Sequence, residues 1–98
     1  MEEINSKQRR ALEKYAHSLE PVVIVGANGV TEQVVKMVSV SLDAHELIKV
    51  KFNEFKDEKR ELTEKICNEC GAYLVRIIGN IAILFRQNKD PEKRKYDL

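Results

Sequence analysis

A run of four β-branched residues at positions 22–25 leads directly into Gly26-Ala27-Asn28-Gly29, and Thr31 follows two residues later. An unbroken run of this kind is typical of a strand that is covered on both faces. Thr31 is a favourable N-cap, so a helix is expected to begin immediately after it. Because a buried strand, a glycine turn and a helix start follow one another so closely, the sequence predicts an α/β domain.

A first helix is expected before this strand. Asn5 or Ser6 can serve as its N-cap, and Gln8 stands three residues after Asn5, which is the spacing of a capping box. Pro21 ends the helical pattern. Within this helix, a spacing of 100° per residue places three cations on one solvent-facing stripe, which consists of Lys7, Arg10 and Lys14.

Two further helices and a strand follow the glycine turn. The second helix is expected to extend to about Asp43, and residues 47–52 alternate as in a half-buried strand. Asp57 is expected to cap the third helix, and Gly71 is its expected C′ residue.

The last two strands are predicted from a hairpin signal. Residues 73–78 and 81–86 are apolar runs joined by Gly79-Asn80, which is typical of a two-residue turn. Alternation about this turn predicts one face that holds Leu74, Arg76, Ile78, Ile81, Ile83 and Phe85. The other face would hold Tyr73, Val75, Ile77, Ala82, Leu84 and Arg86. Both faces are largely apolar, so helices must cover parts of both.

The predicted order is therefore helix, then β-α-β-α-β-β, in a single compact α/β domain with a four-stranded mixed sheet. This domain is expected to span residues 1–87. Residues 88–98 are polar and charged, with basic side chains at Lys89, Lys93, Arg94 and Lys95, and they are expected to form a mobile tail.

Composition excludes several classes of protein without indicating a function. Lys and Arg number 17 and Asp and Glu 16, so a net charge of +1 gives no sign of a nucleic-acid partner. No apolar run approaches the roughly 20 residues of a membrane span, and the start lacks the pattern of a secretory signal. We expect a cytoplasmic protein with no membrane partner, in which the two cysteines are reduced.

The loop Gly26-Ala27-Asn28-Gly29 is the feature with the clearest chemical meaning. Glycine permits a positive φ and removes the Cβ that would keep a ligand's backbone away. A helix start offers unpaired N–H groups and a partial positive charge, which together suit a phosphate. One class of RNA-binding domain clamps a sugar-phosphate backbone with the same glycine spacing. Glycine is also common in strand-to-helix turns for geometric reasons alone, and Glu32 places a negative charge nearby, which Lys36 can offset.

Five ordered blocks of the sequence resemble the CRM domain (chloroplast RNA splicing and ribosome maturation) in its bacterial stand-alone, YhbY-like form. The blocks are residues 6–9, 21–32, 45–51, 71–72, and 78–79 with 83–86. The resemblance implies an RNA-binding domain with the fold of the C-terminal domain of translation initiation factor three. It further implies association with precursors of the large ribosomal subunit, and hence a role in ribosome biogenesis with ribosomal RNA as partner and no small-molecule substrate.

The candidate RNA-binding residues combine the loop with the nearest cations. Many members of the family place Lys or Arg between the two glycines, whereas this chain has Ala27 and Asn28, so positive charge must come from elsewhere. The candidates are Gly26, Ala27, Asn28, Gly29 and Thr31 in the loop, and Lys7, Arg10, Lys14, Lys36, Lys49, Lys51 and Arg86 around it. Lys49 and Lys51 can equally be the solvent side of a strand. Four to six engaged cations predict a log–log salt slope of about −3 to −4.

Other chemistries have weaker support in the sequence. Cys67 and Cys70 form a C-x-x-C in the last helical turn, whose negative end disfavours a thiolate, and only His17 and His45 could complete a zinc site. Both cysteines are therefore expected to be buried structural residues. No nucleophile set, Walker motif or dinucleotide fingerprint occurs, so we expect no catalytic residue, metal or cofactor.

The aromatic content is low, with three Tyr, three Phe and no Trp, and it indicates no stacking platform for bases. Binding is therefore expected to depend on backbone and shape. A second functional hypothesis remains, in which the chain is a protein-interaction adaptor whose basic surface binds an acidic protein.

Overall fold

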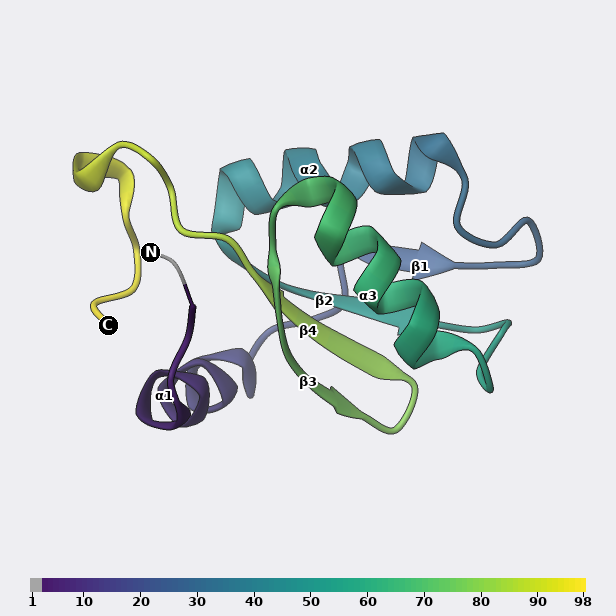
Figure 1. Cartoon of the computed structure of the whole chain (residues 1–98), viewed down its shortest axis with the longest axis horizontal. Coiled ribbons are helices and arrows are strands. Elements are labelled where there is room, and N and C mark those ends of the chain that lie inside the picture. Colours follow the sequence, from purple (N-terminus) through teal and green to yellow (C-terminus); the bar gives the residue numbers. More distant parts are fainter. Residues whose placement is uncertain (1–2) are drawn as a thin grey trace.

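In residues 3–98, which the computed structural model describes, three α-helices and four strands follow each other in the expected order (Figure 1). The elements are α1 (Ser6–Ala16), β1 (Val23–Val25), α2 (Glu32–His45), β2 (Leu47–Phe52), α3 (Lys59–Cys70), β3 (Tyr73–Ile78) and β4 (Ile81–Phe85), with a short 3₁₀ turn, η1 (Pro91–Lys93). Within the same residues, no helix combines the length and the apolar character that crossing a membrane requires.

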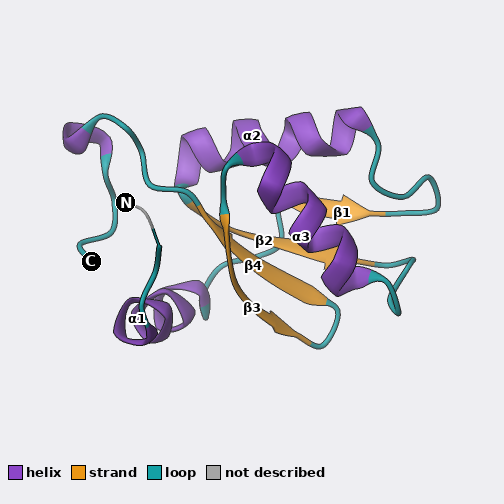
Figure 2. Cartoon of the chain, in the orientation of Figure 1, coloured by secondary structure: helices purple, strands orange, loops and turns teal. Residues whose placement is uncertain are grey.

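The four strands form one mixed sheet in the order β1-β2-β4-β3 (Figure 2). β1 runs parallel to β2, while β4 is antiparallel to both β2 and β3. The turn Gly79-Asn80 joins β3 to β4, with Ile78 opposite Ile81, as the hairpin signal predicts. The predicted four-stranded mixed α/β fold is thereby confirmed.

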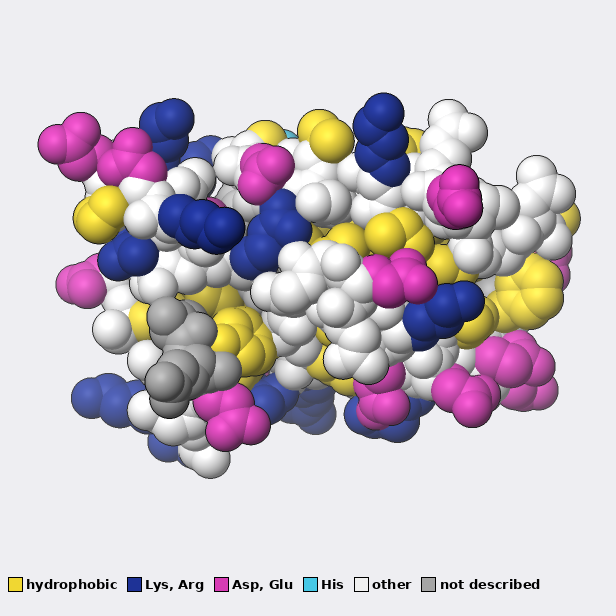
Figure 3. Space-filling view, turned by 45° about the horizontal axis from the view of Figure 1, so that its top comes forward, with side chains coloured by type: hydrophobic (Ala, Val, Ile, Leu, Met, Phe, Trp, Pro, Cys, Tyr) yellow, Lys and Arg dark blue, Asp and Glu magenta, His cyan; other side chains and the backbone are white. Residues whose placement is uncertain are grey.

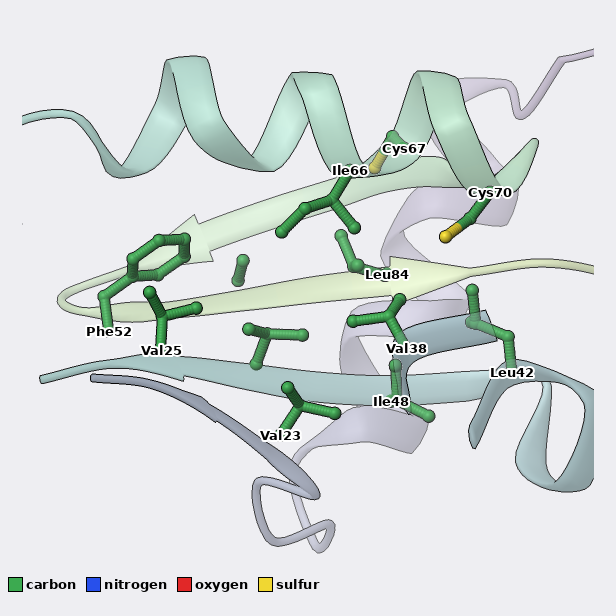
Figure 4. Close-up of a cluster of buried hydrophobic side chains, with 12 residues drawn as sticks. Val23, Val25, Val38, Leu42, Ile48, Phe52, Ile66, Cys67, Cys70 and Leu84 are labelled. Carbon is green, nitrogen blue, oxygen red and sulfur yellow. The ribbon is translucent and has the colours of Figure 1, made fainter. Parts of the chain in front are cut away.

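Helices α2 and α3 cover one face of the sheet and enclose the larger core, part of which Figure 4 shows. Apolar side chains from both helices meet the strands there, among them Val38 and Leu42 of α2 and Ile66 of α3. The buried strand residues of this cluster are Val23, Val25, Ile48, Val50, Phe52, Ala82 and Leu84. Burial of this apolar surface stabilises the packing of both helices on the sheet.

Helix α1 covers only one end of the opposite face. Its buried Leu12 and Ala16 pack with Leu47, at the start of β2, and with Phe85, at the end of β4. The guanidinium of Arg9 fixes the helix by donating to the carbonyl oxygens of two successive residues in β3. Within residues 3–98, no helix covers the other end of this face, around Ile24, Lys51 and Ile81, and this area is called the open sheet face below.

Strand β1 differs from its prediction. The sequence predicts a strand covered on both faces, but β1 is the edge strand, and only its α2 side is buried. Ile24 points to the open sheet face and is 55% exposed. The unbroken apolar run thus predicts a strand correctly, but it does not predict how many faces of that strand are covered.

The predicted faces of β3 are wrong in its first half. A register shift between Leu74 and Arg76 inserts one extra residue opposite β4. Leu74 therefore packs in the α2–α3 core, and Val75 packs with α1, the reverse of the alternation expected from the turn. A bulge of this kind breaks the period of two that the face assignment assumes.

Helix ends agree with the sequence at most positions. Asn5 and Gln8 form the capping box of α1, Thr31 caps α2, and Gly71 adopts the left-handed conformation after α3. The expected cap at Asp57 is wrong, because Glu58 occupies the N-cap of α3, and its side chain accepts no capping hydrogen bond.

The C-terminal segment, residues 88–98, packs back on the domain instead of forming the mobile tail expected from its composition. The buried carboxylate of Glu46, a residue with φ of 63°, accepts hydrogen bonds from the backbone amides of Asn88 and Lys95. The ring of Tyr96 contacts those of Tyr15 and Phe85. Burial, with the nearby Glu46 carboxylate, raises the pKa of Tyr96.

Candidate nucleic-acid interface

The glycine loop forms a tight turn whose tip is exposed. The amide of Gly29 donates to the carbonyl oxygen of Gly26 over 3.0 Å, and Gly29 has a φ of 71°, which favours glycine. Ala27 and Asn28 are exposed at the tip. A Cβ placed on Gly26 would meet no other atom within 4 Å, so the backbone on this side is open to a ligand.

Gly29 itself is not open to a ligand, which corrects the expectation for this residue. It is buried, and a Cβ placed on it would lie 3.3 Å from the ring of Phe55. The glycine is needed so that the chain can take a positive φ and so that this ring can approach. The part of the loop available for binding is therefore Gly26 and the tip.

The start of α2 supplies amides directly after the turn. The hydroxyl of Thr31 accepts from the amide of Val34, and the carbonyl oxygen of Thr31 accepts from the amide of Val35. The amides of Glu32 and Gln33 precede the first intrahelical bond, and the hydrogen bonds of residues 3–98 leave both without an acceptor. Such a helix start carries a partial positive charge and suits a phosphate.

Two predicted cations lie at the loop end of the molecule. Lys36 is exposed one turn into α2, and Lys51 is exposed on the open sheet face, where it pairs in register with Ile24 on one side and Ile81 on the other. Carboxylates are present at this end as well, because Glu32 is in the first turn of α2 and the amide of Glu54 reaches the end of β1. Positive charge at this end of the molecule is therefore limited to a few side chains, with carboxylates nearby.

The basic stripe of α1 lies far from the loop. Lys7, Arg10 and Lys14 are all exposed, as predicted. However, α1 packs at the start of β2, whereas the loop follows the end of β1, which pairs with Phe52 at the end of β2 (Figure 1). The length of β2, about 17 Å, separates the two ends. The structure therefore does not bring the α1 stripe and the glycine loop together.

Lys49 lies between these two regions on the same face of the sheet. It is half-buried, and its Nζ donates to the carbonyl oxygen of Leu19 over 2.9 Å, which leaves it less free than Lys51. Sequence reasoning did not include Arg76 among the candidates, yet both Lys49 and Arg76 pair in register with Ile83. The side chain of Arg76 is 60% exposed and forms an ion pair with Glu13 of α1 at 3.3 Å.

Arg86 is engaged within the fold, which its prediction as an RNA-binding residue did not anticipate. Its guanidinium donates to the hydroxyl and the carbonyl oxygen of Ser39, to the carbonyl oxygen of Cys70, and to the carboxylate of Asp43. These bonds connect the end of β4 with α2 and α3. Both terminal nitrogens of the guanidinium are therefore engaged, which gives Arg86 a structural role.

On the face of α2 and α3, basic and acidic side chains are interspersed (Figure 3). The basic ones gather mainly toward the end that carries the C-terminal segment, whose cations Lys89, Lys93, Arg94 and Lys95 are exposed. On the described part of this face, the basic side chains therefore do not form one continuous patch.

The two cysteines are buried, as expected. Burial, with Cys70 and Glu64 nearby, raises the pKa of Cys67 to about 12, and burial also raises the pKa of Cys70. Both thiols are thus protonated at neutral pH and lie among apolar side chains of the larger core (Figure 4). His17 and His45, the two histidines that could have completed a zinc site, are exposed.

Sequence reasoning missed Phe55, whose ring covers Gly29. The signal available was a single aromatic residue within the charged stretch 53–58, between a strand and a helix. Such a residue belongs to no strand or helix pattern, so periodicity alone predicts neither its contacts nor its role.

A glycine loop of this spacing, placed before a helix start, is also found in one class of RNA-binding domain. Residues 4–86 match the model of the CRS1 / YhbY (CRM) domain, and the chain belongs to that family.

Proteins of several organisms are similar to this chain. The chain is 36% identical over 91 residues to "Probable RNA-binding protein PA4753" of Pseudomonas aeruginosa, an alignment that covers 92% of this chain and 88% of the relative. It is 37% identical over 91 residues to an "RNA-binding protein" of Haemophilus influenzae, with 92% of each chain covered. The solution structure of the hypothetical protein SAV1595 from Staphylococcus aureus is similar, with a TM-score of 0.79, 31% identity, and coverage of 97% of this chain and 100% of that one.

Proposed function

We propose that this chain is a non-enzymatic, cytoplasmic RNA-binding protein that docks on the phosphate backbone of ribosomal RNA and acts in assembly of the large ribosomal subunit. Membership of the CRM domain family and relatives that carry RNA-binding names support RNA as the partner. The large-subunit role follows from what the family resemblance implies.

The observation that carries the proposal is the exposed turn at the start of α2. Ala27 and Asn28 project from it, Gly26 leaves the backbone open, and the amides of Glu32 and Gln33 lie directly behind. A phosphate placed there would accept from backbone donors that water otherwise satisfies. Its negative charge would be offset by Lys36 and Lys51.

The loop and the α1 stripe lie far apart, so the number of cations that RNA engages indicates how far the RNA extends over the surface. A short contact at the loop would engage Lys36 and Lys51, which predicts a log–log salt slope of about −1.4. An RNA that crosses the open sheet face past Arg76 and also reaches Lys7, Arg10 and Lys14 would engage six cations and give a slope of about −4. We expect the extended path, because the open sheet face and the exposed α1 stripe offer a phosphate backbone more cations than the loop alone.

The test is the affinity of the purified protein for a labelled large-subunit RNA fragment across a range of salt concentrations. Asn28→Asp places a negative charge at the exposed tip and is expected to weaken binding about five- to tenfold, whereas Asn28→Ser, which adds no charge, should bind within about twofold of the unmodified protein. Gly29 is unsuitable for this test, because its positive φ and the Phe55 ring make any substitution strained. Equal affinity of both Asn28 variants would contradict the proposed site.

The partner and its location are tested in cells. Crosslinking followed by sequencing of the bound RNA should recover large-subunit ribosomal RNA, and the protein should sediment with precursors of that subunit. Absence from every precursor fraction would exclude the assembly role. Capture of an acidic protein that survives nuclease treatment would favour the adaptor hypothesis instead.

A further inference from the structure

Phe55 differs from the other two phenylalanines of the chain. Phe52 and Phe85 are fully buried in the two cores, whereas Phe55 lies in the loop between β2 and α3 and is 41% exposed. Its φ is 56°, a conformation that a bulky aromatic residue rarely adopts. Backbone strain of this kind persists only where the surroundings enforce it, and it concentrates at functional sites.

Hydrogen bonds hold this loop against the glycine turn. The amides of Asn53 and Glu54 both donate to the carbonyl oxygen of Val25, the residue immediately before the turn, and the amide of Glu58 donates to the carbonyl oxygen of Phe55. The Phe55 ring then meets Gly29. One side of the ring is fixed against Gly29, next to the proposed phosphate site, and Phe55 remains 41% exposed.

The charges around Phe55 indicate which part of a nucleotide fits there. Glu54, Asp57 and Glu58 are exposed in the same loop and outnumber its one cation, Lys56, so the net negative charge of the loop disfavours a phosphate. An uncharged base is not repelled in this way, and an aromatic face attracts it by stacking whatever its identity. The exposed groups that suit a phosphate lie at the turn and at the start of α2.

We propose that Phe55 stacks on an unpaired base of the RNA whose phosphate lies at the turn of Gly26 and Asn28, an inference that rests on the proposed function. The ligand class is therefore a single-stranded or bulged nucleotide, because bases inside an RNA helix do not expose a face to a side chain. The glycine turn binds the backbone, and Phe55 selects for an unstacked base beside it.

A double cycle between Phe55 and the base tests the stacking. Phe55→Leu keeps an apolar cover over Gly29 but removes the aromatic face. With a labelled single-stranded RNA of about 12 nucleotides, this change should weaken binding about fivefold or more and leave the salt slope unaltered, because no charge is lost. With the same strand lacking its bases, Phe55→Leu should bind as the unmodified protein does. An equal loss on both strands would overturn the stacking.

A second measurement does not depend on how well the Leu variant folds. The chain contains no tryptophan, so Phe55→Trp introduces a single indole at the site. Stacking on a base should quench its fluorescence when the single-stranded RNA is added. Val40→Trp, at a position on α2 that is 58% exposed, serves as the matched control and should not be quenched.

The outcomes separate this inference from the function on which it rests. If the unmodified protein binds RNA with a salt-dependent affinity but neither Phe55 variant shows the expected effect, the stacking is wrong and the proposed function stands. If the unmodified protein binds none of the RNAs, including the large-subunit fragment, both are wrong.

Discussion

The guanidinium of Arg86 lies 2.8 Å from the carboxylate of Asp43, across the boundary between β4 and α2. The same side chain also bonds to Ser39 and to the carbonyl oxygen that precedes Gly71. Arg86, which the sequence predicts as an RNA-binding residue, thus joins the sheet to both helices of the larger core.

Replacement of Arg86 by Lys should destabilise the fold. A single ammonium cannot reproduce the planar fork that reaches all of these acceptors, so partly buried carbonyl groups lose their donors. We expect the free energy of unfolding in urea to fall by about 2–4 kcal/mol. Arg60→Lys on the exposed side of α3 is the control and should change it by less than about 0.5 kcal/mol. Weaker RNA binding by folded Arg86→Lys, without a loss of stability, would show that the structural role is wrong.

Local signals in the sequence determine much of the fold. Asn5 with Gln8, Thr31 and the Gly79-Asn80 turn each act through hydrogen bonds or backbone angles within a few residues, and all of them have their expected place. The exposure of Lys51 follows in the same way, from simple alternation along β2. Such features depend on neighbours in the chain, which a sequence displays directly.

The features that the sequence did not reveal depend on contacts between distant residues. The bulge after Leu74 changes which side chains of β3 meet α1, although no residue type there announces it. Gly29 has the pattern of a ligand-binding glycine, but its actual neighbour is Phe55, 26 positions later in the chain (55 − 29). The composition of the C-terminal segment predicts a mobile tail. It cannot predict the contact that holds the segment, because the anchor, Glu46, lies in another part of the sequence.

Substitution of Tyr96 tests whether the C-terminal segment is part of the folded domain. The ring centroids of Tyr96 and Tyr15 are 5.2 Å apart, and Phe85 lies beneath. Tyr96→Ala should therefore lower the free energy of unfolding by about 1–3 kcal/mol, while Lys93→Ala, which removes an exposed side chain of the same segment, should have little effect. If thermal unfolding shows the two variants to be equally stable, the segment does not pack as described.

The alkaline stability of the protein should depend on Cys67. Its pKa is raised from 9.0 to about 12 in the fold, so the folded state holds the thiol proton more tightly than the unfolded chain does. The stabilisation is complete below pH 9 and is lost as the pH rises toward 12. Cys67→Ala should flatten this decline in unfolding free energy, after allowance for the cavity that it creates. A variant whose stability falls with the same slope as that of the unmodified protein would show that this thiol does not carry the effect.

Addition of a cation at the tip of the glycine loop should strengthen RNA binding. Ala27 is exposed, so Ala27→Lys adds a positive charge beside the proposed phosphate without displacing a packed side chain. One more phosphate neutralised should steepen the log–log salt slope by about 0.7 and raise the affinity most at low salt. Ala44→Lys adds the same charge near the other end of α2 and is the matched control, expected to change the slope by much less. The two variants have the same net charge. An equal change in the salt slope of both would therefore mean that RNA responds to overall charge and that the loop is not where the phosphate binds.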